Sequence, residues 1–223
     1  MNLLVTGFTS EIASEVINQF KSTRPDIKII TVGRDPSSDF ICDFSNYSSV
    51  IEFVKHTLPE LDLSYIFLNH GILYGEKALN LSEEQLRKYM MVNCYSYIAI
   101  LEAVSNHENL NTVIMSSISG KEGSYDPIYA ATKAGVDSFR YKSRNNLPSS
   151  SRLNFISPGI ISDAKMTTIR EDIANLATLK EKTPTKNFTT SREVASMIVY
   201  LLNTPGNINF QDIAINGGMS FNK

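Results

Sequence analysis

The chain has 223 residues, a length that suits one α/β domain spanning 1–223 and excludes a large second domain. Its 42% hydrophobic and 20% charged residues are typical of a soluble protein, and its net charge of −2 gives no electrostatic reason to expect nucleic acid or an anionic membrane as a partner. No stretch approaches the ~18 apolar residues of a membrane span. Cys42 and Cys94 form no CxxC pair or disulfide framework, so we expect reduced thiols in a cytoplasmic protein without a metal.

Apolar runs of strand length alternate with amphipathic segments of helix length along the chain. The predicted strands are 3–6, 27–32, 65–68, 112–115, 153–156 and 212–215, and the predicted helices are 11–21, 47–58, 82–106, 128–146 and 191–202. This alternation predicts an α/β fold, a single-domain Rossmann-type doubly wound parallel sheet with helices on both faces. Residues 162–190 carry the least pattern and are predicted to form a substrate loop with one or two small helices.

A turn joins the first strand to the first helix, where backbone N–H groups and a helix dipole would face a pyrophosphate. The residues of this turn that we expect to contact a dinucleotide are Gly7, Thr9, Ser10, Glu11 and Ile12. Glu11 and Ala13 stand where a glycine-rich fingerprint has glycines. A carboxylate beside a pyrophosphate is unfavourable unless it points away, so an ordinary strand–loop–helix remains the alternative.

The second strand is followed by Gly33 and Arg34, without the acidic residue that binds the ribose hydroxyls of NAD. An arginine here favours NADP, because its guanidinium can form a charge-assisted fork to a 2′-phosphate. Asp35 follows, so a solvated Arg-Asp turn is the alternative. About eight residues lead from Arg34 to a further short strand that ends at Cys42, besides the six runs given above. This is too few for the usual crossover helix, which leaves the adenine side open. Beyond that strand, we expect Asp43 to accept from the adenine amino group and Phe44 to lie against the ring.

Tyr129 and Lys133 are four residues apart on a predicted helix and so share one face. A tyrosine transfers protons poorly at neutral pH, because its ordinary pKa is about 10, and a nearby ammonium favours the phenolate. Ser116 and Ser117 follow the predicted strand 112–115, where a serine hydroxyl can hold a substrate carbonyl oxygen. Taken separately, each motif has an alternative interpretation. For Tyr129 and Lys133 it is an exposed pair on a helix, and for the two serines it is an ordinary serine-rich turn.

Six segments follow one another along the chain, namely LNHG (68–71), MVN (91–93), SSISG (116–120), YAATKAG (129–135), NFISPG (154–159) and IAINGG (213–218). Taken together and in this order, they resemble the short-chain dehydrogenase/reductase superfamily over nearly the whole chain. The resemblance implies cofactor contacts from Asn69, His70, Gly71, Pro158, Gly159 and Ile161, besides Tyr129 and Lys133.

The resemblance also implies a catalytic tetrad. Tyr129 would exchange a proton with the substrate oxygen, Lys133 would lower the tyrosine pKa and bind the nicotinamide ribose, and Ser117 would orient the carbonyl. Asn93 would hold a water that relays protons. Ser117 matches the family's S-x-x-G spacing, although the loop to Tyr129 is then one residue short, so Ser116 remains an alternative. Relatives pair through the long helices, which implies a homodimer or homotetramer.

Two further departures from the family pattern are visible. His70 replaces a small residue, and we favour a packed or cofactor-contacting imidazole over an acid/base group. Asp163 stands where the family often has a threonine near the carboxamide.

The sequence predicts an NADP-preferring carbonyl reductase or alcohol dehydrogenase acting on a small molecule. The alternatives are a non-redox lyase or dehalogenase and a non-catalytic dinucleotide-sensing protein. The predicted substrate-lining residues are Tyr74, Tyr125, Met166 and Ile169. Lys165 and Arg170 would meet an anionic substrate or else are ordinary exposed loop charges.

Overall fold

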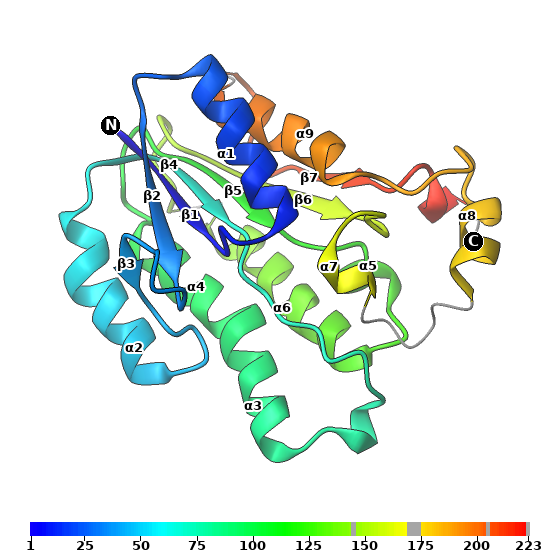
Figure 1. Cartoon of the computed structure of the whole chain (residues 1–223). Helices are drawn as coiled ribbons and strands as arrows, with labels where there is room; N and C mark the ends of the chain where they lie inside the picture. Colours follow the sequence, from blue (N-terminus) through cyan, green and yellow to red (C-terminus); the bar gives the residue numbers. More distant parts are fainter. Residues whose placement is uncertain (144–145, 169–174, 204–205, 222–223) are drawn as a thin grey trace.

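The sheet has the predicted parallel, doubly wound form in the computed structural model, which describes residues 1–143, 146–168, 175–203 and 206–221 (Figure 1). Seven parallel strands of these described residues form one sheet in the order β3-β2-β1-β4-β5-β6-β7. The strands are β1 Asn2–Thr6, β2 Lys28–Gly33, β3 Phe40–Ile41, β4 Leu63–Leu68, β5 Asn111–Met115, β6 Arg152–Pro158 and β7 Asp212–Ile215. The strand order reverses direction between β1 and β4, and ligands bind doubly wound sheets at such a switch point.

Helices cover both faces of the sheet, which explains why most strands read as continuous apolar runs. Helices α1 (Glu11–Thr23) and α9 (Ser191–Asn203) pack side by side on one face. Helices α2 (Tyr47–Glu52), α4 (Ser96–Ala103) and α6 (Pro127–Ser143) cover the other. Cys42 and Cys94 are buried and form no disulfide with each other.

The predicted helix 82–106 is divided by a π-helical turn. Helix α3 (Glu83–Met90) begins at a capping box of Ser82 and Gln85, and the π-helical turn Met91–Tyr95 joins it to α4. Helix α2 likewise continues as a π-helical turn, Phe53–Thr57, and a 3₁₀ turn, Leu58–Glu60. π-Helical turns occur frequently at functional sites, and the one between α3 and α4 carries Asn93.

Residues 34–39, which connect β2 to β3 and are all described, contain no helix, in agreement with the short crossover predicted from the sequence. The remaining small elements are α5 (Ser119–Glu122), α7 (Lys165–Thr168), α8 (Leu176–Lys182) and 3₁₀ turns at Ala78–Asn80 and Met219–Phe221. Helices α7 and α8 are the small helices expected between 162 and 190, whereas Ile169 and Arg170 lie outside the described residues. Within the described segments, no helix is long and apolar enough to cross a bilayer.

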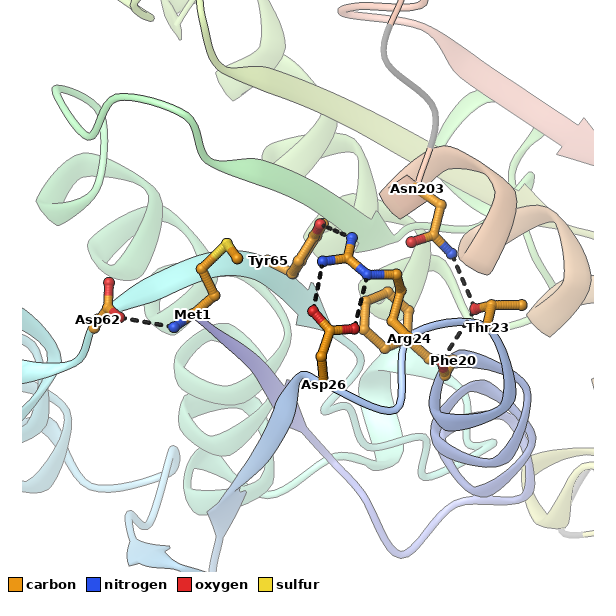
Figure 2. A network of polar contacts seen from close by, with 8 residues as sticks. All are labelled: Met1, Phe20, Thr23, Arg24, Asp26, Asp62, Tyr65 and Asn203. Atoms are coloured by element: carbon orange, nitrogen blue, oxygen red, sulfur yellow. Dashed lines mark hydrogen bonds and ion pairs between the residues drawn. The ribbon is translucent and has the colours of Figure 1, made fainter.

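A network of polar contacts lies at the amino-terminal ends of the strands (Figure 2). The Arg24 guanidinium forms an ion pair with Asp26 and donates to the Tyr65 hydroxyl at 2.6 Å. The amino group of Met1 pairs with Asp62 at 2.8 Å. The Met1–Asp62 pair ties the start of β1 to the start of β4, and Arg24 ties the segment between α1 and β2 to β4. These contacts lie at the opposite end of the strands from the cavity described next.

Candidate active site

A cavity of about 1240 Å³ lies at the carboxyl ends of the strands. It exceeds the ~300–1,000 Å³ of ordinary small-molecule sites, so it has room for a dinucleotide and a small substrate together. The predicted cofactor residues that line it are Gly7, Thr9, Ser10, Glu11, Ile12, Arg34, Asp43, Phe44, Asn69, His70, Gly71, Pro158, Gly159 and Ile161. Ser117, Tyr129 and Lys133 line the same cavity, whereas Asn93 is fully buried and does not.

The geometry of the first turn is compatible with the predicted phosphate contacts. Gly7 has φ +60°, and a Cβ there would lie 2.8 Å from the Cα of His70 and 2.9 Å from the carbonyl oxygen of Asn69. Only glycine fits this conformation and this close approach. Ser10 caps α1, and its Oγ accepts from the Ala13 amide at 3.2 Å and from Asn69 Nδ2 at 2.8 Å. The Ser10 hydroxyl proton remains available to donate, so the turn fits a pyrophosphate at the helix N-terminus.

Glu11 occupies the first position of α1, where the family pattern has glycine. Its side chain is exposed, and Oε2 accepts from the Lys165 amide at 3.4 Å, at the start of α7. The carboxylate therefore joins the cofactor turn to the loop that carries α7.

In the turn after β2, the side chains of Arg34 and Asp35 have different surroundings. Asp35 Oδ1 accepts from the hydroxyl and the amide of Ser37, at 2.6 and 2.9 Å, and these bonds lower the pKa of Asp35. No carboxylate in the described part of the chain forms an ion pair with Arg34, which is exposed at the cavity. The guanidinium is thus available to an anionic group of a ligand.

His70 is packed beneath the cofactor turn. Its ring is buried and stacks on Phe44, with 3.9 Å between centroids. Burial, and then the charge of Lys133, hold the His70 pKa well below its ordinary value, so the imidazole is neutral. One face of the Phe44 ring is thus covered by His70. The neighbouring Asp43 accepts through Oδ1 from the Ser45 hydroxyl at 2.7 Å.

The hydrogen bonds of His70 define its tautomer. Ser96 Oγ donates to the Val92 carbonyl at 2.9 Å, so it accepts from His70 Nε2–H at 2.8 Å. The Nδ1 atom then accepts from the Thr6 hydroxyl, also at 2.8 Å. The imidazole therefore bridges the end of β1 to α4, which agrees with a packed role.

Tyr129 and Lys133 lie one turn apart on α6. Tyr129 is half-buried, and the Lys133 ammonium lies 5.9 Å from the centre of its ring. Lys133 Nζ donates to the Met115 carbonyl at 2.9 Å. Burial lowers the pKa of Lys133 to about 8, against the opposing effects of Asp137 and Cys94. The amine is therefore mostly protonated at neutral pH.

The two serines after β5 have different surroundings. The hydroxyl of Ser116 is buried and donates to Asp137 Oδ1 at 2.6 Å. Ser117 is half-buried, and its Oγ accepts from the Ser119 amide at 3.2 Å. Because Ser117 keeps its own proton to donate into the cavity, it suits a substrate oxygen better than Ser116.

Asn93 binds a single peptide with both ends of its amide. Oδ1 accepts from the Ile72 amide, and Nδ2 donates to the Ile72 carbonyl, each at 2.8 Å. Asn93 therefore ties the π-helical turn to the loop that follows β4.

Of the residues predicted to contact the substrate, Tyr74, Tyr125, Lys165 and Met166 line the cavity. Asp163 does not line the cavity. Its Oδ1 accepts from the amide and hydroxyl of Ser191, at 2.8 and 3.0 Å, at the start of α9. Leu179 and Met219 also line the cavity and were missed, because nothing in their local sequence marks them.

Three buried polar residues next to the site were also missed, namely Tyr89, Asp126 and Asp137. Asp126 precedes Tyr129 by three residues, the spacing of a helix N-cap, and Asp137 follows Lys133 by four, the spacing of a shared helix face. Both signals were present in the sequence. Nothing in the sequence pairs Tyr89 with Asp126.

Comparisons with known proteins agree with this fold. A family model described as enoyl-(acyl carrier protein) reductase matches residues 26–220. The chain is 23% identical over 190 residues to 2-dehydro-3-deoxy-D-gluconate 5-dehydrogenase of Bacillus subtilis (strain 168), covering 81% of this chain and 74% of the relative. It is similar in structure to a short chain dehydrogenase family protein from Francisella tularensis subsp. tularensis SCHU S4, with a TM-score of 0.85, 19% identity and coverage of 99% of this chain and 98% of that one. ElxO with NADP bound is similar at a TM-score of 0.79 and 20% identity, with coverage of 99% and 98%. Because the family model spans most of the chain, the chain belongs to the short-chain dehydrogenase/reductase superfamily of oxidoreductases.

Proposed function

We propose that the chain is an NADP-preferring reductase or dehydrogenase that interconverts a carbonyl group and an alcohol on a small molecule. The observation that carries the proposal is the Lys133 ammonium held 5.9 Å from the Tyr129 ring at the wall of a cavity large enough for a dinucleotide. When bound, the cofactor supplies or accepts the hydride.

Side chains of the site supply the proton and orient the substrate oxygen. Tyr129 donates a proton to the substrate oxygen during reduction, and the nearby Lys133 ammonium stabilises the phenolate that remains. Ser117 donates a hydrogen bond to the same oxygen and orients it. Asn93 supports the proton path by fixing the Ile72 peptide, next to Gly71 on the cavity wall.

The preference for NADP is proposed on the basis of Arg34. Its guanidinium is exposed at the cavity without a carboxylate partner in the described chain, and the similar protein ElxO has NADP bound. Arg34→Ser should weaken NADPH binding by about 10- to 100-fold, the range for a hydrogen bond to a charged group, and leave NADH binding unchanged. Equal losses for both dinucleotides would contradict the preference.

We also propose a homodimer or homotetramer through α3, α4 and α6. Support comes from Leu86 and Met90, which are large, apolar and exposed on α3. Sedimentation of the wild type and of Leu86→Glu tests this, because a charge in the interface should produce monomers.

A cytoplasmic location is proposed from the buried, unpaired Cys42 and Cys94.

The decisive experiment is a panel of carbonyl substrates followed by NADPH absorbance. We expect turnover with at least one substrate class, and a loss of about 10²- to 10⁴-fold in kcat for Tyr129→Phe with NADPH affinity retained. Tyr47→Phe is the matched control, since Tyr47 is exposed on α2. Binding of NADPH without any turnover would favour a dinucleotide sensor, and no binding would favour a non-redox member of the superfamily.

A further inference from the structure

Helix α6 holds the end of β5 through two side chains one turn apart. The Lys133 ammonium donates to the Met115 carbonyl at 2.9 Å, and Asp137 Oδ1 accepts from the Ser116 hydroxyl at 2.6 Å. Met115 and Ser116 are consecutive and directly precede Ser117. We call these two contacts the strand-end clamp. The clamp sets where Ser117 lies relative to the helix that carries the catalytic tyrosine.

Asp137 is a buried carboxylate with few donors. Its Oδ2 is buried and has no hydrogen-bond partner among the described residues. The charged groups that face it are Lys133 on its own helix, Lys121 on α5 and Asp212 on β7, and Lys121 is itself paired with Asp212. Burial raises the pKa of Asp137 above its ordinary value and Asp212 adds to this rise, against the hydrogen bond from Ser116 and the charges of Lys121 and Lys133, which lower it. The Ser116 hydroxyl and the two lysines thus offset part of the cost of burying the ionised carboxylate.

Lys133 in turn depends on Asp137 for electrostatic support. The titratable groups of the described chain that face the ammonium are Asp137 on α6, Cys94 on the π-helical turn, Tyr97 on α4, Tyr129 on α6 and His70 after β4. Asp137 is the carboxylate of this set, and His70 is neutral. Because burial disfavours the ammonium, removal of the Asp137 charge should release its proton at lower pH.

We propose that Asp137 is a positioning residue of this site, which keeps the Lys133 ammonium charged and, through Ser116, holds Ser117 in place beside Tyr129. The proposal rests on the proposed function for its effect on turnover. Its electrostatic part can be measured whether or not the protein reduces any carbonyl.

Three variants separate the two parts of this role. Asp137→Asn removes the charge but keeps the shape and an oxygen that can accept from Ser116. Ser116→Ala removes the hydrogen bond but keeps the charge. Asp212→Asn is the matched control, because it removes a neighbouring buried carboxylate that is not in the strand-end clamp.

The first measurement is an NMR titration of the lysine ε-CH₂ groups in the intact protein, with the Lys133 signal assigned from Lys133→Arg. We expect Asp137→Asn to lower the Lys133 midpoint by about one pH unit or more, the size expected for loss of a close opposite charge. Ser116→Ala should move it much less, and Asp212→Asn should not lower it. An unchanged midpoint in Asp137→Asn, or an equal fall in Asp212→Asn, overturns the proposal. Should Asp137→Asn fail to fold, Asp137→Ser provides the same comparison.

The second measurement is the pH profile of kcat/KM for carbonyl reduction. Asp137→Asn should move the alkaline limb to lower pH, whereas Ser116→Ala should lower kcat without moving the limb. A shifted NMR midpoint without turnover in any variant would refute the proposed function and leave the coupling of Asp137 to Lys133 intact. Turnover with an unshifted midpoint would refute the coupling and leave the proposed function intact.

Discussion

The Tyr89 hydroxyl donates to Asp126 Oδ2 at 2.5 Å, and both side chains are fully buried. Asp126 Oδ1 accepts from the Tyr129 amide at 2.9 Å, at the start of α6. The Tyr89 oxygen also accepts from the Tyr74 amide at 2.6 Å. One hydrogen-bonded pair therefore connects the helix that carries Tyr129 to the loop that carries Tyr74 on the wall of the same cavity.

Tyr89→Phe should destabilise the fold and disturb the substrate side together. The change leaves Asp126 Oδ2 and the Tyr74 N–H without their partners in a buried place, which costs about 1–3 kcal/mol for each unsatisfied group. Urea unfolding measures the loss, and KM should rise more than kcat falls because Tyr74 moves. Tyr47→Phe should stay within about 0.5 kcal/mol of the wild type. An equal loss of unfolding free energy in Tyr89→Phe and Tyr47→Phe would show that the buried Tyr89–Asp126 pair does not stabilise the fold.

Gly7→Ala should remove dinucleotide binding and lower stability. The added methyl group meets the Cα of His70 at 2.8 Å, in addition to the backbone strain of φ +60°. Gly123→Ala is the control, because φ is also positive there (+86°) and nothing lies within 4 Å of the new Cβ. Strain alone costs about 1–3 kcal/mol, so we expect a larger loss at Gly7 in urea unfolding. NADPH affinity that survives in a folded Gly7→Ala protein argues against this turn as the phosphate cradle.

Glu11→Gln should strengthen NADPH binding. A carboxylate at the start of α1 repels a pyrophosphate bound at that helix end, and the amide keeps an oxygen for the Lys165 N–H. The gain should be about two- to fivefold, as expected for an exposed charge pair, and should shrink at high salt. Glu15→Gln, one turn further along α1, serves as the control in the same fluorescence titration. An equal response at both positions points to a general charge effect.

Lys133→Met should change how stability depends on pH. The pKa of Lys133 is lowered from 10.5 to about 8 by burial, so between these values the unfolded chain binds more protons than the folded one. The wild type therefore gains stability as pH rises through this window, by up to about 1.4 kcal/mol per pH unit, and the variant lacks this gain. Urea unfolding at pH 7, 8, 9 and 10 measures the difference. A difference that stays flat across the window would mean that Lys133 titrates normally.

Much of the fold was predictable because local pattern and tertiary structure agree. Strands buried on both faces require continuous apolar runs, and helices packed on the sheet require a 3.6-residue period, so element order and type were readable. The bounds of the short strand β3 and the π-helical turn at Asn93 were not predicted from the sequence. A two-residue strand has no periodicity, and a π-helical turn is set by packing between helices.

The candidate site was predictable where its residues follow strand ends, since the carboxyl ends of parallel strands meet at one edge. Gly7, Asn69 and Ser117 belong to this group. Leu179 and Met219 reach the same cavity from remote, weakly patterned segments.

The sequence by itself determined the strand–helix order, the superfamily motifs, and the spacing that places Tyr129 and Lys133 on one face of a helix. These features are local, encoded by residues within one element or one turn. Only the tertiary structure decided which serine turns to Asp137, that His70 is packed and neutral, and that Tyr89 meets Asp126. Those outcomes depend on burial and on partners far away in the chain, and neither is carried by any short stretch of sequence.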